Sequence, residues 1–271
     1  KMSKCLGNGI DPLEMIERYG ADALRLTLIT GNAPGNDMRF YYERVEASRN
    51  FANKIWNASR FIMMNMPEEG VGKEKPDLEP VDKWILSKLN TLIQEVTSNM
   101  ESFELGIAVQ KVYDFIWDEF CDWYIEMVKP RLYGTDDKTK KAALWTLKTV
   151  LIDALKLLHP YMPFITEEIF CTLQSEEESI MVSRWPEFRE EWRFDREEKD
   201  IETIKEAVRG IRNVRTEMNV APGKKAQVFV VSENEDALKA FTEGKLFFAS
   251  LAGASEVTIQ KERCCRILWC L

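Results

Sequence analysis

Two lysines stand around a small residue at the start of the chain, in the run Lys1-Met2-Ser3-Lys4-Cys5. Gly7 follows, and the first helix-start signal comes only at Asp11-Pro12, so the run is expected to form a loop. Such a loop can bring ammonium groups onto phosphate oxygens. Positive charge placed where phosphoryl charge develops stabilises a transition state. The pattern predicts a phosphate-binding loop, with a solvated lysine-rich segment as the alternative.

A second group of cations lies near the end of the chain. Spacings of four, three and three place these four on one face of a helix: Lys205, Arg209, Arg212 and Arg215. Lys224 and Lys225 follow shortly after. Residues 205–225 hold six basic and two acidic side chains, a local charge of 6 − 2 = +4. This favours a phosphate-contacting face. The alternative is a solvated helix whose cations pair with Glu202, Glu206 and Glu217.

Other catalytic chemistry finds little support. The single histidine, His159, precedes a proline at a helix junction, where a structural role is expected. No Ser-His-Asp set, P-loop or metal cluster can be assembled, so no metal site is predicted. The six cysteines, at 5, 121, 171, 264, 265 and 270, form no C-x-x-C pair. Their scatter is typical of reduced thiols.

The composition limits the class of protein. A chain of 271 residues with 45% hydrophobic and 30% charged residues predicts one or two globular domains. Its 37 Lys and Arg against 45 Asp and Glu give −8, which excludes a globally basic nucleic-acid binder but not a local basic face. No apolar run of about 18 residues and no secretory signal occurs. A cytoplasmic location without a membrane partner is expected, and the absence of Met at position 1 indicates part of a longer protein.

Helical patterns fill the first two thirds of the chain. A capped helix should begin at Asp11-Pro12, pause near Gly20 and resume over 21–30. Apolar residues recur at helical spacing in the long segment 42–66. Four further helical stretches are predicted, at 81–102, 104–133, 136–158 and 163–173. Their short connections make antiparallel neighbours, so residues 42–175 are expected to form a helix bundle with Trp117 and Trp123 in its core.

The last third changes character. Residues 176–202 carry eleven acidic and five basic side chains and are predicted to cross the bundle surface as a strap. A small α/β unit is expected over 203–271. Its predicted elements are a helix at 197–218, a strand at 226–232, helices at 235–242 and 247–252, and a strand at 256–260. Residues 264–271 fit neither a helical nor a strand pattern. The predicted fold is therefore mainly α.

The N-terminal run resembles the KMSKS signature of class I aminoacyl-tRNA synthetases, with Cys5 in place of the final serine. Five longer blocks resemble the valyl-tRNA synthetase family. They lie at 6–40, 50–61 (NFANKIWNASRF), 114–133 (DFIWDEFCDWYIEMVKPRLY), 157–170 (LLHPYMPFITEEIF) and 211–222 (IRNVRTEMNVAP). The resemblance runs in order through residues 1–260. It implies that residues 1–41 end a catalytic domain and that 42–175 form the family's anticodon-binding bundle.

The resemblance also implies chemistry. Enzymes of this family use ATP, with Mg, to join valine to tRNA(Val) through valyl-adenylate, and a monomer is expected. Lys4 takes the place of the lysine that meets the ATP phosphates, with Lys1 as a weaker contributor and Met2 and Ser3 in the same ATP-binding loop. The adenine and amino-acid pockets of the family lie before this loop. The chain alone is therefore not expected to catalyse adenylation.

The resemblance places RNA contacts on the bundle and the tail. RNA loops are read by stacking and by hydrogen bonds to splayed bases. The candidates on the first long helix are Arg49, Asn53, Lys54, Asn57 and Arg60. Those at the end of 104–133 are Lys129, Arg131 and Tyr133, and those in the tail are Arg209, Arg212 and Arg215. The alternative for each is a solvated or bracing role.

Two rival interpretations stay open. An isoleucyl-tRNA synthetase shares several of these blocks, but it differs in the segments around CDWYIE and IRNVRTEMN and ends in a zinc-binding tail. The other rival is a noncatalytic RNA-binding protein or a nonfunctional gene fragment.

Overall fold

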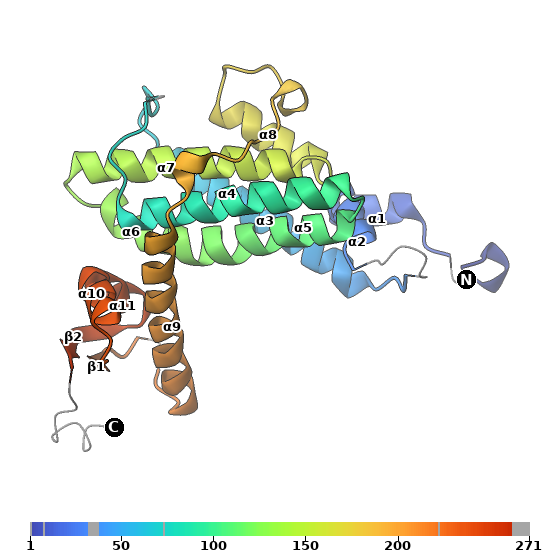
Figure 1. Ribbon diagram of the computed structural model, residues 1–271. Coiled ribbons are helices and arrows are strands. Elements are labelled where there is room, and N and C mark those ends of the chain that lie inside the picture. The colour runs from blue at the N-terminus through green and yellow to red at the C-terminus, as the bar shows by residue number, and fades with distance from the viewer. Residues whose placement is uncertain (1, 8, 32–37, 73, 222, 262–271) are drawn as a thin grey trace.

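The computed structural model describes residues 2–7, 9–31, 38–72, 74–221 and 223–261. Four helical rods pack side by side as a bundle (Figure 1). They are α3 (Tyr42–Asn65), α4 (Pro80–Glu101), the continuous rod α5–η2–α6 (Leu105–Asp114, Phe115–Tyr124, Ile125–Leu132) and α7 (Asp137–Leu158). The predicted mainly helical fold with a small α/β unit is confirmed.

Local signals in the sequence set the ends of these rods. Pro80 occupies the first turn of α4, where Glu79 and Asp82 cap each other's backbone. Asp136 accepts from the Lys138 N–H at the start of α7. Phe103 turns the chain between α4 and α5 with a positive φ of 58°. These tight ends keep the rods antiparallel.

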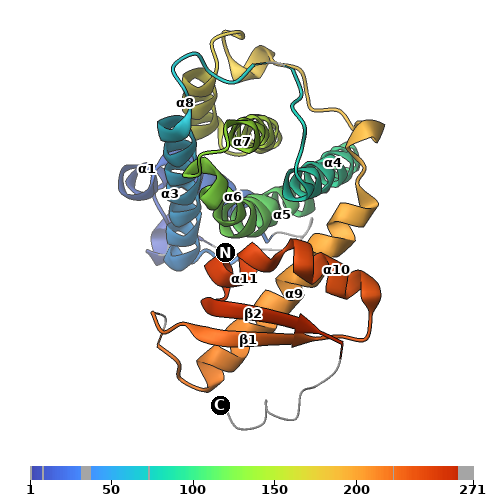
Figure 2. The ribbon, with the colours of Figure 1, turned by 90° about the vertical axis from the view of Figure 1, so that its left-hand side faces the viewer.

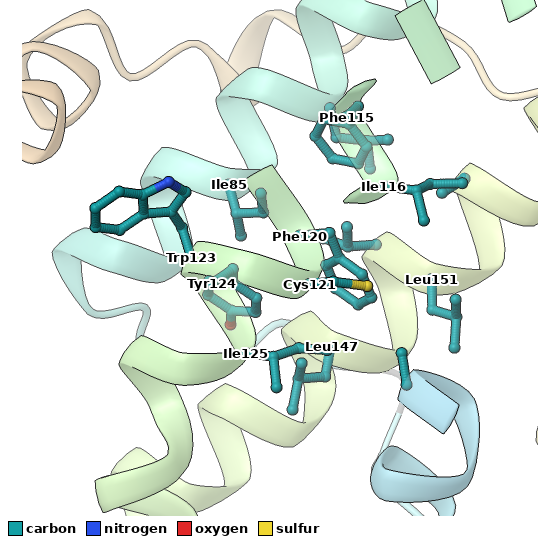
Figure 3. Close-up of a cluster of buried hydrophobic side chains, with 14 of the residues drawn as sticks. Ile85, Phe115, Ile116, Phe120, Cys121, Trp123, Tyr124, Ile125, Leu147 and Leu151 are labelled. Atoms are coloured by element: carbon teal, nitrogen blue, oxygen red, sulfur yellow. The ribbon is translucent and has the colours of Figure 1, made fainter. Parts of the chain in front are cut away.

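The third rod contains a ten-residue π-helical stretch, η2, where the sequence predicts a plain helix. At its end the Ile125 N–H donates to the Phe120 carbonyl five residues back. Figure 3 shows side chains of η2 gathered with those of α4 and α7, among them Ile85, Phe115 and Leu151. Trp123 is buried, as predicted, whereas Trp117 is only partly buried.

Short helices flank one end of the bundle. They are α1 (Pro12–Tyr19), α2 (Ala21–Ile29) and α8 (Pro163–Leu173), and η1 (Lys4–Leu6) precedes α1 in the chain. Asp11 caps α1 as predicted, and α2 packs on both α3 and α8. The segment that carries the lysine-rich run is therefore joined to the bundle.

An irregular segment with η3 (Ile180–Val182) and η4 (Glu190–Trp192) crosses from α8 to α9 (Asp195–Glu217). The Asn90 side chain donates to the Arg189 carbonyl and accepts from its N–H, which fixes the segment on α4. The predicted strap of 176–202 is thus too long, because residues 195–202 are already helical. Acidic side chains in the first turn, including Asp195, stabilise this helix start.

Helix α9 runs away from the bundle and carries the small α/β unit beside its far half (Figures 1 and 2). That unit contains β1 (Ala226–Val231), α10 (Glu235–Glu243), α11 (Lys245–Leu251) and β2 (Ala254–Gln260). The two strands pair in parallel, with Phe229 opposite Thr258. The predicted order of helix, strand, two helices and strand is confirmed within two residues at each end of the strands and short helices. Among the described residues no helix is long and apolar enough to cross a membrane.

Candidate nucleic-acid interface

One face of α3 presents polar and aromatic side chains that the rest of the described chain leaves uncovered. Asn53, Trp56, Asn57 and Arg60 lie within two turns on this face. All four are exposed, Trp56 by 38%. Their side chains make no hydrogen bond, ion pair or ring contact with another described residue. Amide, indole and guanidinium groups are those that stack on and hydrogen-bond to RNA bases.

The opposite face of α3 explains this orientation. Phe51, Ile55 and Ile62 are fully buried against the other rods. Burial of such large apolar groups fixes the rotation of the helix about its axis. Asn53, Asn57 and Arg60, which lie between these residues in the sequence, therefore point away from the core. We call Asn53, Trp56, Asn57 and Arg60 the α3 face.

Two cations of α3 are held by neighbouring side chains instead. Arg49 lies 3.5 Å from Glu46 and its guanidinium is 5.8 Å from the ring centre of Tyr19. The Lys54 ammonium is 2.7 Å from Asp122 and only 3.7 Å from the ring centre of Trp117. A cation held over a ring and beside a carboxylate is already partly neutralised.

At the end of α6 the candidates also have partners. Lys129 contacts Glu126 and lies 5.8 Å from the ring centre of Phe61. Tyr133 is exposed at the helix end. RNA contact by these two residues stays a prediction, although the Lys129 charge is balanced within its own helix.

Arg131 is the most firmly engaged of the bundle candidates. Its two terminal nitrogens bind the Asp82 carboxylate at 2.7 and 2.8 Å, and one also reaches the Thr139 carbonyl at 2.7 Å. The Tyr124 hydroxyl donates to the same carboxylate at 2.8 Å. Burial works to lower the pKa of Arg131, but the bonds and charge of Asp82 outweigh it and raise that pKa. RNA contact by Arg131 stays a prediction that would require it to leave a buried carboxylate.

The basic residues of α9 do not form one open stripe. Lys205 is fully buried and its ammonium binds Glu119 and Glu202. It also lies 4.8 Å from the ring centre of Trp84. Burial works to raise the pKa of Glu202, but the ammonium groups of Lys205 and Lys88 together outweigh it and lower that pKa. The expectation that Lys205 belongs to a phosphate-contacting face is wrong, because this cation ties α9 to the bundle.

The three arginines that follow on α9 are also engaged, though less completely. Arg209 and Arg212 lie 5.3 and 5.2 Å from the ring centre of Trp123. Arg212 donates to the Leu251 carbonyl at 2.8 Å, which joins α9 to α11. Arg215 donates to the Lys224 carbonyl at 2.6 Å. Arg209 and Arg212 remain exposed, so an RNA contact on their outer side stays a prediction.

The lysine-rich run begins outside the described residues, since Lys1 is not among them. The backbone of Lys4 starts the short helix η1, and the Lys4 side chain lies outside the described part of the chain. Met2 is exposed, and the Ser3 carbonyl accepts from the Leu6 N–H at 3.1 Å. The ATP contacts of Lys1, Met2, Ser3 and Lys4 stay predictions.

Side-chain hydrogen bonds join α2 to the turn between α7 and α8 and to the start of α8. The buried carboxylate of Asp22 accepts from the backbone N–H groups of Phe164 and Ile165, at 3.3 and 2.8 Å. It thereby caps a helix whose own N-cap residue gives no side-chain bond. Arg25 donates to the carbonyls of Pro160 and Tyr161. The joint fixes the N-terminal segment on the bundle.

His159 lies in the turn between α7 and α8, where its side chain contacts Thr166 of α8. Its Nδ1 lies 2.7 Å from the Thr166 hydroxyl. Burial lowers its pKa, and the charges of Glu167 and Asp22 oppose this shift only in part. Among the described residues no group of three His, Cys, Asp or Glu side chains could hold a metal ion.

A family model named "Anticodon-binding domain of tRNA ligase" matches residues 82–230, more than half of the chain. The chain belongs to this family. A second model, "tRNA synthetases class I (I, L, M and V)", matches residues 1–41. The second match ends one residue before α3 begins, and α3 itself lies outside both matched ranges.

This chain is similar to valine–tRNA ligases over nearly the whole of its own length. It is 59% identical to that of Clostridium tetani over 95% of this chain and 29% of the relative. It is 47% identical to that of Bacillus cereus over 97% of this chain and 30% of the relative. The chain therefore spans less than a third of the length of the relatives it matches.

Two solved structures share the fold at low sequence identity. A ternary complex of Agrobacterium radiobacter K84 agnB2 LeuRS with tRNA and LeuAMS matches 72% of this chain and 23% of that chain, with a TM-score of 0.55 and 19% identity. Methionyl-tRNA synthetase of Mycobacterium tuberculosis matches 62% of this chain and 35% of that chain, with a TM-score of 0.53 and 19% identity. At these identities the likeness shows the fold alone.

Trp56 is the site residue that the sequence patterns missed. It lies on the outer side of α3 between Asn53 and Arg60. The apolar residues that predict this helix from the sequence, such as Phe51 and Ile55, lie on its buried face. A bulky apolar residue out of phase with Phe51 and Ile55 was the available signal.

Proposed function

We propose that the chain is the tRNA-binding part of a valine–tRNA ligase and that it recognises tRNA(Val). The observation that carries this is the 59% identity to a valine–tRNA ligase. The similarity extends over 259 residues, which is 95% of this chain. The anticodon-binding model over residues 82–230 supports RNA as the ligand. The relatives described above are both valine–tRNA ligases, which favours this proposal over the isoleucine-specific rival.

The α3 face is the proposed contact surface. Its two amides can hydrogen-bond base edges, Arg60 can meet a phosphate, and Trp56 can stack on an unpaired base. None of these four groups must leave a protein partner to do so, in contrast to Lys54 and Arg131. RNA contact at the α3 face therefore requires the least rearrangement among the candidates.

The rest of the proposal concerns the longer ligase. There Lys4, with Lys1, Met2 and Ser3, would form the loop that closes on ATP during valine activation. Lys4 would supply positive charge to the phosphates as they separate. Mg²⁺ would accompany ATP in the longer ligase. We further propose a monomeric, cytoplasmic enzyme, and that the chain alone does not form valyl-adenylate.

Binding to tRNA transcripts across a salt series tests the proposal. The chain should bind tRNA(Val) more tightly than tRNA(Ile), and exchanging the anticodon of tRNA(Val) should remove the preference. The logarithm of the binding constant should fall linearly with the logarithm of salt concentration. Equal binding of all three transcripts would contradict anticodon recognition by this chain.

A further inference from the structure

Helix α2 lies beside α1 at one end of the bundle, and side chains on two of its sides hold it there (Figure 1). Asp22 and Arg25, about one turn apart, bind the turn between α7 and α8 and the start of α8. On another side the buried hydroxyls of Thr27 and of Ser48 on α3 lie 2.8 Å apart. The position of α2 is therefore set by elements that are distant from it in the sequence.

The two charged residues of α2 match the polarity of the backbone that they contact. The buried Asp22 carboxylate accepts from the N–H groups of Phe164 and Ile165, in the first turn of α8, where the helix dipole favours negative charge. The Arg25 guanidinium donates to the carbonyls of Pro160 and Tyr161 at 3.0 and 3.2 Å. Replacing either side chain by an apolar one removes a charged partner from these backbone groups.

Gly20 joins α1 to α2 without a linker, because it ends the first helix and directly precedes the second. Its N–H donates to the Ile16 carbonyl at 2.9 Å, and its carbonyl accepts from the Leu24 N–H at 3.3 Å. Its φ of 90° and ψ of 152° lie in a region that glycine alone adopts without strain. The direction of α1 therefore follows from the position of α2.

Helix α1 in turn follows the lysine-rich run directly in the chain. Its cap residue, Asp11, comes six positions after Cys5, the last residue of that run. Met15 of α1 is buried, and the Tyr19 ring centre lies 5.8 Å from the Arg49 guanidinium of α3. Because α1 is packed on both α2 and α3, a shift of α2 is passed to the point where the run begins its path away from the bundle.

We propose that Asp22 and Arg25 are positioning residues for the ATP-binding loop, which fix α2 and thereby α1 and Lys4 during valyl-adenylate formation. This inference rests on the proposed role of Lys4. In that step a valine carboxylate oxygen bonds to the α-phosphorus of ATP. The bond from this phosphorus to the bridging oxygen breaks, and its electron pair leaves with pyrophosphate.

A misplaced loop can still contact the phosphates of bound ATP, but it no longer meets the charge that develops as they separate. The contacts of Asp22 and Arg25 should therefore act on kcat and hardly on the KM for ATP. These contacts are formed within the described chain, whatever precedes or follows it in a longer ligase.

Valine-dependent exchange of pyrophosphate into ATP by the longer ligase measures this step. Asp22→Ala should lower kcat by about tenfold and change the KM for ATP and for valine by less than about twofold. Asp22→Asn keeps one oxygen as an acceptor, so it should recover part of the loss. Arg25→Met should lower kcat in the same way, because it loosens the same turn.

Asn90→Ala is the matched control for a general loss of stability. The Asn90 side chain also makes two hydrogen bonds to a distant backbone, that of Arg189, but it joins α4 to the segment before α9. Both Asp22→Ala and Asn90→Ala should lower the midpoint of thermal unfolding. Only Asp22→Ala should lower kcat, and only there should amide hydrogen exchange of the chain become faster over α1 and α2.

A double-mutant cycle separates this inference from the role of Lys4 itself. Lys4→Met should lower kcat, and adding Asp22→Ala should cost little more, because the main cation of the loop is then absent. Should Asp22→Ala not fold, Arg25→Met takes its place. An unchanged kcat in Lys4→Met would contradict the proposed ATP contact. If Lys4→Met lowers kcat but the two losses multiply, or if Asn90→Ala lowers kcat equally, Asp22 does not position the loop.

Discussion

The exposed face of α3 and the basic face of α9 look equivalent as sequence and differ in the folded molecule. Both carry polar or cationic residues at helical spacing, and both are candidates for RNA contact. On the α3 face the side chains of Asn53, Asn57 and Arg60 have no partner among the described residues. On α9 Lys205 is buried and Arg212 and Arg215 donate to carbonyls of the small α/β unit.

The difference arises from what lies opposite each helix. Glu119 and Trp123, both on η2, provide the carboxylate and the ring that engage the cations of α9. No side chain of the described chain bonds to Asn53, Asn57 or Arg60 of the α3 face. Helical spacing shows which residues share a face, whereas the availability of a charge depends on residues that are distant in sequence.

The largest expected effect is on stability, at Lys205. Lys205→Met leaves Glu119 without its cation and Glu202 with Lys88 alone, so the free energy of unfolding should fall by about 3 kcal/mol. Both carboxylates retain some exposure, which limits the loss. Urea unfolding followed by circular dichroism measures it. Lys199→Met, an exposed position on the same helix, should change stability by less than about 0.5 kcal/mol. Equal effects of the two variants would mean that Lys205 is not a structural cation.

Neutralising the three arginines of α9 gives the next largest effect. Replacing Arg209, Arg212 and Arg215 together by Gln should lower the free energy of unfolding by about 2 kcal/mol, through lost ring contacts and charge-assisted hydrogen bonds. If these arginines serve only the fold, the salt dependence of tRNA(Val) binding should change little. A fall of about 2–3 in that slope would show that these arginines also contact phosphates, and the contrast with the α3 face would then fail.

Trp56→Ala should weaken tRNA(Val) binding by about tenfold, because stacking of one base contributes about 1–3 kcal/mol. The free energy of unfolding should also fall, by about 1–2 kcal/mol, because only 38% of Trp56 is exposed and the covered part of the ring loses its packing. Trp56→Phe keeps an aromatic surface and should recover most of the affinity. If the Phe variant binds as weakly as the Ala variant, the indole does not act by stacking.

Much of the fold could be predicted because its signals are local. Asp11-Pro12 and Asp136 mark helix starts, and Phe51, Ile55 and Ile62 mark a buried face. The π-helical stretch at 115–124 could not be predicted, because its apolar residues fit an ordinary helix almost equally well. It packs against α3 and α4, which are distant from it in the sequence.

The candidate site was harder to predict than the fold. Arg131 and Lys205 look like free cations until Asp82 and Glu119 are placed beside them by tertiary structure. The polar members of the α3 face could be named from the sequence, whereas Trp56 was indicated only by its position out of phase with Phe51 and Ile55. Exposure of an aromatic residue is decided by the rotation of its helix, which the whole apolar face determines.

Arg60→Gln is the smallest and most specific test of the contrast. If Arg60 meets one phosphate, its loss should reduce the slope of log binding constant against log salt by about 1 and weaken all tRNA sequences alike. Stability should stay within about 0.5 kcal/mol, because no protein partner loses a bond. Arg184→Gln is the control, since Arg184 is exposed on the segment between α8 and α9, where no RNA contact is proposed. An unchanged slope for Arg60→Gln would mean that an unpaired cation on α3 is simply solvated, and that availability alone does not identify an RNA-binding residue.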